Sequence, residues 1–168
     1  MRRIFSFPNP VNEYAARTVA AGVVLMAALF LATGWTWLLV VLVYGFAARV
    51  AAGPRFSPLG QLAVRVIAPR LPVEPKLTPG PPKRFAQSIG LLFSTSALIL
   101  ALSLGTLAAQ LVIAMLLVAA LLESALGICL GCKAFALLMR LGLIPASVCA
   151  ECGDLSIRYP ELASAKAS

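Results

Sequence analysis

Two long stretches of the chain are apolar and almost free of charge. Thr18 to Ala48 contains no charged residue, and Phe85 to Cys132 contains only Glu123. A membrane span needs about 20 apolar residues, so a single helix over either stretch is about twice too long. Each stretch therefore predicts a hairpin of two spans, with reversals near Gly34 and Gly105. The predicted spans are residues 14–32, 35–51, 86–104 and 107–128.

The segments outside the spans predict shorter elements. The loop 52–85 contains "SPLGQLAVRV", in which Ser57 and Pro58 are typical of a helix start and apolar residues recur at helical spacing. This amphipathic helix either lies on the cytoplasmic leaflet or packs over the end of the bundle. Residues 129–153 carry the cysteines and predict a short helical hairpin, followed by a tail, 154–168. The fold class is therefore all-α: one polytopic membrane domain, residues 1–168, with four transmembrane helices arranged as two hairpins.

Charge gives the predicted orientation. The chain is 61% hydrophobic and has a net charge of +8, which in a soluble protein would favour nucleic acid. Here the apolar runs favour the lipid bilayer as partner, and no nucleic acid is expected. All Lys and Arg fall in residues 1–17, 49–84 and 133 onward, and none in either reversal. The positive-inside rule then predicts a multi-pass protein of the inner cell membrane with both termini cytoplasmic.

Glu123 is a carboxylate within the fourth predicted span. A charge in a bilayer costs a few kcal/mol on insertion scales, so such a residue usually has a partner. Arg17 and Arg49 lie at the same predicted depth and could form a structural ion pair with Glu123. The alternative is a catalytic role, in which Glu123 accepts protons from nearby thiols.

Four cysteines form the pattern C-x2-C-x16-C-x2-C, and the chain has no histidine. The absence of histidine excludes His-based catalysis and His-metal sites. Four thiolates could bind one zinc ion tetrahedrally, and the spacing fits such a site. Alternatively, each C-x-x-C pair could cycle between dithiol and disulfide, which a cytoplasmic position permits for transient disulfides. Inert buried cysteines are the third possibility. The four residues are Cys129, Cys132, Cys149 and Cys152.

Several segments resemble a bacterial membrane-protein family called domain of unknown function 4395. They are "PVNEYAAR", "GPRFSPLGQLAVRV", "PKRFAQSIG" and "LESALGICLGCK", and the G-x-C-x-G-C element is the most specific. The resemblance implies a four-helix membrane protein without an assigned catalytic residue. Family members are often encoded near thioredoxin-like or sulfurtransferase proteins, which favours thiol chemistry with such a soluble partner.

Three functions follow from these observations. The preferred one is thiol redox or sulfur handling, with the catalytic residues Cys129, Cys132, Cys149, Cys152 and Glu123 and no required cofactor. The second is a non-enzymatic scaffold or assembly subunit in which the four cysteines hold a structural zinc. The third is a small-solute transporter that uses Glu123 and the hydroxyl groups of the third span. No Gly-rich phosphate loop is present to indicate nucleotide binding.

Overall fold

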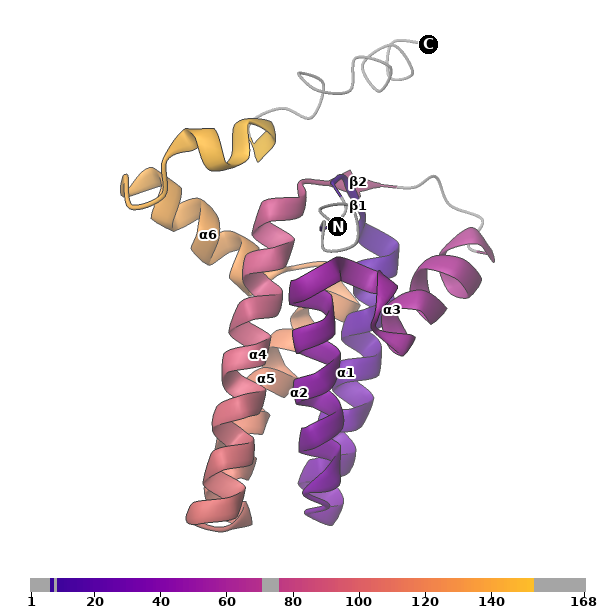
Figure 1. Ribbon diagram of the computed structural model, residues 1–168, viewed down its shortest axis with the longest axis vertical. Coiled ribbons are helices and arrows are strands. Elements are labelled where there is room, and N and C mark those ends of the chain that lie inside the picture. Colours follow the sequence, from indigo (N-terminus) through magenta and orange to yellow (C-terminus); the bar gives the residue numbers. More distant parts are fainter. Residues whose placement is uncertain (1–6, 8, 71–75, 153–168) are drawn as a thin grey trace.

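Four long helices form the body of the molecule in the computed structural model, which describes residues 7, 9–70 and 76–152. They run antiparallel as two hairpins (Figure 1), and each belongs to a helical segment long and apolar enough to cross a membrane. For the second helix that segment is Trp37–Arg70, which continues past its end. The all-α, four-span fold class predicted from the sequence is therefore confirmed. The helices are α1 (Glu13–Thr33), α2 (Trp37–Ala52), α4 (Gly80–Ser103) and α5 (Thr106–Leu126).

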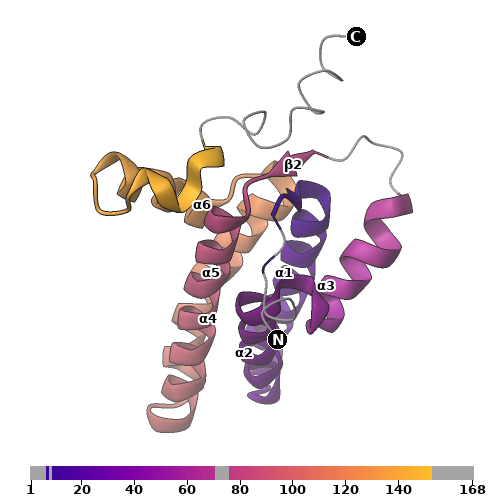
Figure 2. The same cartoon turned by 45° about the horizontal axis from the view of Figure 1, so that its top comes forward.

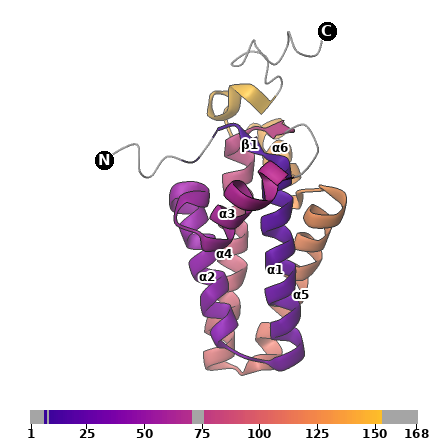
Figure 3. The same cartoon turned by 90° about the vertical axis from the view of Figure 1, so that its right-hand side faces the viewer.

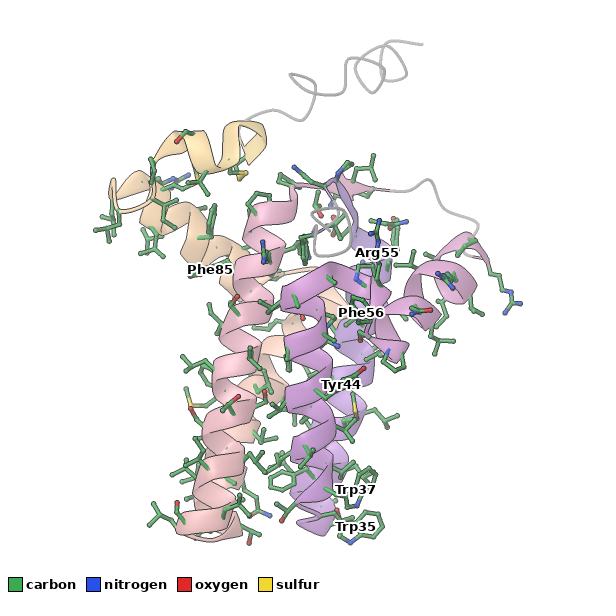
Figure 4. The ribbon with its side chains drawn as sticks, viewed as in Figure 1. Trp35, Trp37, Tyr44, Arg55, Phe56 and Phe85 are labelled. Carbon is green, nitrogen blue, oxygen red and sulfur yellow. A yellow bond between two sulfur atoms is a disulfide. The ribbon has the colours of Figure 1, made fainter. Side chains whose placement is uncertain are left out.

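The two hairpin turns lie at the same end of the bundle (Figure 1). Gly34 and Gly105 occupy them with positive φ values of 70° and 93°, a conformation that glycine adopts without Cβ strain. Trp35 and Trp37 lie at this end, 53% and 56% exposed, as rings at a membrane–water interface do (Figure 4). The described Lys and Arg residues belong to segments at the opposite end, which we call the basic end.

Small residues allow the helices to pack closely. Seen from the side, α1 lies beside α5 and α2 beside α4 (Figure 3). A Cβ on Gly90 would lie 2.2 Å from the ring of Phe46, so this glycine makes room for the ring. Ser94, in the same helix as Gly90, is fully buried and donates to the carbonyl of Leu91, which supports packing rather than a solute path. Large apolar side chains on the outer faces remain exposed: Leu25, Val40, Leu92, Ile99, Leu107, Leu111 and Met115.

A helical segment extends from the end of α2 along α1. After a 3₁₀ turn, Gly53–Arg55, Ser57 caps α3 (Pro58–Leu62) by accepting from the N–H of Gly60, as its sequence predicted. The segment continues as a π-helix, Ala63–Ile67, and a 3₁₀ turn, Ala68–Arg70. Ala63 packs fully buried against Ala15 and Val19 of α1, whereas Leu62 and Val64 are exposed. The segment thus packs on the bundle and keeps an apolar outer face.

A short strand pair, not predicted from the sequence, ties the start of the chain to the start of α4. β1 (Val11–Asn12) pairs antiparallel with β2 (Leu77–Thr78). Asn12 caps α1, and Asn9 accepts a hydrogen bond from the N–H of Gly80 at 2.9 Å. An ion pair of 3.0 Å between Glu13 and Lys76 closes the junction.

The C-terminal segment lies across the basic end. α6 (Leu130–Arg140) leaves the end of α5 and crosses α4, and the 3₁₀ helix η4 (Ala146–Cys152) follows it (Figure 2). α6 and α3 project from different sides of the bundle (Figure 1). Both chain termini, predicted to be cytoplasmic, and the tail 154–168 lie outside the described residues.

Candidate functional site

A short turn at the end of α5 leads into the first cysteine pair. Gly127 ends α5 with a left-handed φ of 69° and donates its N–H to the carbonyl of Glu123 at 3.1 Å. Glycine is favoured at this position because a Cβ would be strained there. Cys129 follows two residues later and is the capping residue of α6. The turn therefore holds Glu123 and Cys129 at the same corner of the bundle.

The two thiols of the first pair contact each other directly. The S–H group of Cys132 donates to the sulfur of Cys129, with 2.6 Å between the sulfur atoms, and the backbone N–H of Cys132 donates to the same sulfur at 3.3 Å. A disulfide joins sulfur atoms at about 2.05 Å, so a small movement would close one. Cys129 is 8% exposed, and Cys132 is half-buried.

Gly131, between the two cysteines, allows this pair to approach α4. A Cβ on Gly131 would lie 2.6 Å from the Cβ of Ala86 and 2.7 Å from its Cα. Any other residue would therefore push the two helices apart. One turn further on, the ring of Phe135 packs on Phe85 of α4 with 5.5 Å between centroids (Figure 4). The N-terminal end of α6 is thus held against α4.

Lys83 of α4 and Glu123 of α5 form a buried ion pair near the thiols. Lys83 Nζ lies 2.7 Å from Glu123 Oε1, and their side chains are 7% and 15% exposed. The two charges also act on both sulfur atoms, because Lys83 favours the thiolate and Glu123 disfavours it. The site therefore contains two thiols and two opposite charges on three helices.

Arg17 does not pair with Glu123, so this part of the sequence prediction is wrong. Its guanidinium donates instead to the backbone carbonyls of Ser124 at 3.1 Å and Ala125 at 2.6 Å. The last carbonyls of a helix lack intrahelical partners and carry partial negative charge. Arg17 is thus drawn to the end of α5 rather than to the carboxylate one turn earlier.

Arg49, the other expected partner, is also bonded elsewhere. It is 5% exposed, donates to Gln87 Oε1 at 2.7 Å and to Ser57 Oγ at 3.2 Å, and lies over the ring of Phe46 at 4.6 Å. Gln87 belongs to α4, and Ser57 precedes α3. Arg49 therefore joins α2 to α3 and α4, while Lys83 occupies the place beside Glu123.

The sequence pattern missed Lys83 because the third span was expected to begin at residue 86. α4 begins at Gly80, with Pro81 and Pro82 in its first turn. Proline is favoured there because the first N–H groups of a helix have no intrahelical partner. A helix that begins at Gly80 turns one row of small or polar residues toward the bundle. The prolines in "GPPK" are the sequence feature that could have predicted this helix start. The buried members of the row are Gly80, Lys83, Gly90, Ser94 and Ala97.

The hydrogen bond between the thiols makes their acidities unequal. By donating to Cys129, the thiol of Cys132 stabilises the Cys129 thiolate and lowers the pKa of Cys129, and the same bond raises the pKa of Cys132. Burial opposes ionisation of both groups. The N-terminus of α6 additionally favours a negative charge at its capping residue. Cys129 is thus the more acidic thiol of the pair.

The second cysteine pair is a disulfide. Cys149 and Cys152 are bonded within η4, and α6 and a turn at Gly142 separate them from the first pair. A structural zinc needs four ligands gathered around one point. Within residues 7, 9–70 and 76–152, no three Cys, His, Asp or Glu side chains are gathered in this way. The predicted zinc ligands thus form two pairs near each other, one of free thiols and one a disulfide.

The comparison with protein families agrees with the sequence resemblance. A family model described as "Domain of unknown function (DUF4395)" matches residues 11–140, so the chain belongs to this family. The matched region contains the ion pair and the first cysteine pair and ends before the second. Comparisons with curated proteins and with solved structures found no match.

The acidity of Cys129 should depend on the hydrogen bond from residue 132. We expect Cys132→Ala to shift the alkylation midpoint of Cys129 to higher pH, because the donor is lost. Cys132→Ser, which keeps a donor, should shift it less. The measurement is the pH dependence of labelling by a small alkylating reagent, read on the Cys129 peptide by mass spectrometry. Identical profiles for the two variants would show that the hydrogen bond does not set this pKa.

Removing the carboxylate of the ion pair should destabilise the bundle. Glu123→Gln leaves Lys83 buried without a counter-charge, which should lower the free energy of unfolding by about 3–5 kcal/mol. We expect Lys83→Met to recover much of this loss when combined with Glu123→Gln. The measurement is denaturant unfolding in detergent.

Arg17→Gln provides the matched control, because Arg17 binds backbone carbonyls and not Glu123. The decrease in the free energy of unfolding caused by Arg17→Gln should add to the decrease caused by Glu123→Gln. Additivity between Lys83→Met and Glu123→Gln, or strong coupling of Glu123→Gln to Arg17→Gln, would contradict the pairing.

Proposed function

We propose that this chain is a thiol–disulfide oxidoreductase of the inner cell membrane that exchanges electrons with a soluble thioredoxin-like protein or sulfurtransferase. The observation that carries the proposal is the Cys129–Cys132 pair, with its sulfur atoms 2.6 Å apart and one sulfur capping a helix. A reactive cysteine needs a stabilised thiolate. The hydrogen bond from Cys132, the N-terminus of α6 and the charge of Lys83 favour a thiolate at Cys129, whereas burial and Glu123 oppose it.

Exposure and acidity together suggest the direction of exchange. Cys132 is the more exposed residue of the pair, and Cys129 has the lower pKa. Thiol–disulfide exchange is faster when the leaving thiol has a low pKa. A thiolate of the reduced partner therefore attacks Cys132 in the Cys129–Cys132 disulfide, and Cys129 leaves as thiolate. A second partner thiolate then attacks the partner sulfur joined to Cys132. This releases the partner as a disulfide and leaves both chain thiols reduced, a transfer of two electrons.

Glu123 and the second cysteine pair have supporting roles in this proposal. Glu123, whose charge acts on both sulfurs, accepts a thiol proton only transiently when the disulfide forms and passes it on, so that its ion pair with Lys83 is restored. Cys149 and Cys152 are the second couple, mounted on η4 after the Gly142 turn. They would exchange with the first pair by the same two-step attack. No cofactor is required for these steps.

The redox proposal predicts a reversible two-electron titration. Purified full-length protein is equilibrated with mixtures of reduced and oxidised dithiothreitol, and free thiols are trapped with a mass-shifting alkylating reagent. We expect Cys129 and Cys132 to change state together. Cys129→Ser should trap a mixed disulfide through Cys132 with a thioredoxin-like protein. Cys132→Ser should trap less, because Cys129 is buried.

Other results would overturn this function. One stoichiometric zinc per chain, with thiols blocked until chelation, would establish the scaffold function instead. If the purified protein contains no metal and its thiols do not titrate reversibly, the solute-transporter function is favoured instead. A thiol titration in which Cys129 and Cys132 change state independently would also contradict the proposed couple.

The orientation is proposed from the distribution of charge: the basic end faces the cytoplasm. Reporters active only in the periplasm or only in the cytoplasm are fused after Gly34, Lys76 and Ser168. We expect periplasmic activity only at Gly34, which lies in a turn at the other end of the bundle. Periplasmic activity at Lys76 or Ser168 would contradict the cytoplasmic site and its soluble partner.

A further inference from the structure

A cavity of about 310 Å³ lies inside the bundle next to the first cysteine pair. All four long helices and the start of α6 contribute to its wall. Its lining is mostly apolar and includes Val23, Phe46, Phe93 and Leu116. Cys129 is one of the lining residues. The sulfur that is nearly closed to solvent thus borders a space within the membrane-spanning bundle.

The cavity reaches the outer surface of the bundle. Met115 and Leu130 line it and are 62% and 44% exposed. Met115 lies near the middle of α5, a candidate membrane span, so its exposed side faces lipid at mid-span depth. A ligand can therefore arrive laterally from the bilayer. Ligand pockets of this kind are apolar with a few placed polar groups, and a volume of about 300 Å³ falls within their usual range.

The polar groups of the lining restrict the ligand class. They are Gln87, Glu123 and Cys129, and no lining residue is a Lys or Arg. A phosphate-bearing dinucleotide would place its negative charge in an apolar wall beside Glu123, which is unfavourable. A neutral ring with carbonyl oxygens fits better. The Oε1 atom of Gln87 accepts from Arg49 at 2.7 Å, which leaves the NH₂ group of Gln87 as a donor for such a carbonyl.

We propose that this cavity binds a membrane quinone, which oxidises the Cys129–Cys132 dithiol. The inference rests on the proposed thiol function and names the lipid-side acceptor for its electrons. The two thiols lose two protons and two electrons and form one S–S bond. The quinone gains the two protons and the two electrons, and its two carbonyl oxygens become hydroxyl groups. Electrons thus enter from a soluble dithiol at Cys132 and leave through the cavity beside Cys129.

The test uses single-turnover oxidation of the purified full chain in detergent. Cys149 and Cys152 are replaced by Ser so that only the first pair reacts. The protein is reduced, freed of reductant and mixed with decylubiquinone, and quinone absorbance and free thiols are followed together. Quinol and disulfide should form in equal amounts.

Filling the cavity should slow this reaction selectively. Ala119 lines the cavity from α5, whereas its neighbour Val118 does not line it and is 56% exposed. We expect Ala119→Phe to slow oxidation by decylubiquinone roughly tenfold or more, a barrier change near 1.4 kcal/mol. Val118→Phe should leave the rate nearly unchanged. The rate at which oxidised dithiothreitol oxidises the same thiols should be similar in the parent protein, Ala119→Phe and Val118→Phe. If Ala119→Phe does not fold, Ala119→Leu replaces it.

The outcomes separate this inference from the function on which it rests. Reversible dithiothreitol titration with no quinone reduction would overturn the quinone site and keep the thiol function. Equal slowing by Ala119→Phe and Val118→Phe, or no slowing by a folded cavity variant, would also overturn it. Thiols that do not titrate with dithiothreitol would end both proposals together.

Discussion

The ion pair between Lys83 and Glu123 fixes the geometry of the basic end. Its two side chains come from helices of the same hairpin, and both are largely removed from water. Neither charge is stable at that depth alone, so the N-terminal turn of α4 must lie beside the C-terminal turn of α5. The β1–β2 pair and the hydrogen bond from the N–H of Gly80 to Asn9 reinforce this placement by holding the start of α4 against the start of α1. The thiol site is built on this corner.

Two glycines shape the corner that carries the first cysteine pair. Gly127 reverses the chain directly after α5, and Gly131 lets α6 contact Ala86 of α4. Without the first, Cys129 would not be placed to cap α6. Without the second, the thiols would move away from Lys83. Both glycines of "GICLGC" therefore set the position of the two thiols. Their spacing also lets one thiol donate to the other across the first turn of a helix.

The sequence predicted the hairpins well because each apolar run is too long for one span and too uniform for a soluble domain. It also predicted that Glu123 needs a basic partner, because burial of a lone charge is costly regardless of fold. The identity of that partner depended on where α4 begins and which face it turns inward. Arg17 and Arg49 were plausible by depth alone. The carbonyls at the end of α5 and the side chain of Gln87 attract them instead, and those interactions appear only once the helices are packed.

The opposed charges beside the thiols have a kinetic consequence. The hydrogen bond from Cys132 lowers the pKa of Cys129 most, burial and Glu123 raise it, and Lys83 lowers it. A thiol with a very low pKa is a good leaving group but a poor nucleophile, and exchange is fastest when the pKa lies near ambient pH. A lone cation in this apolar corner would favour the thiolate more strongly and would itself be costly to bury. The opposed charges of Lys83 and Glu123 therefore leave the hydrogen bond from Cys132 as the main influence that favours a Cys129 thiolate.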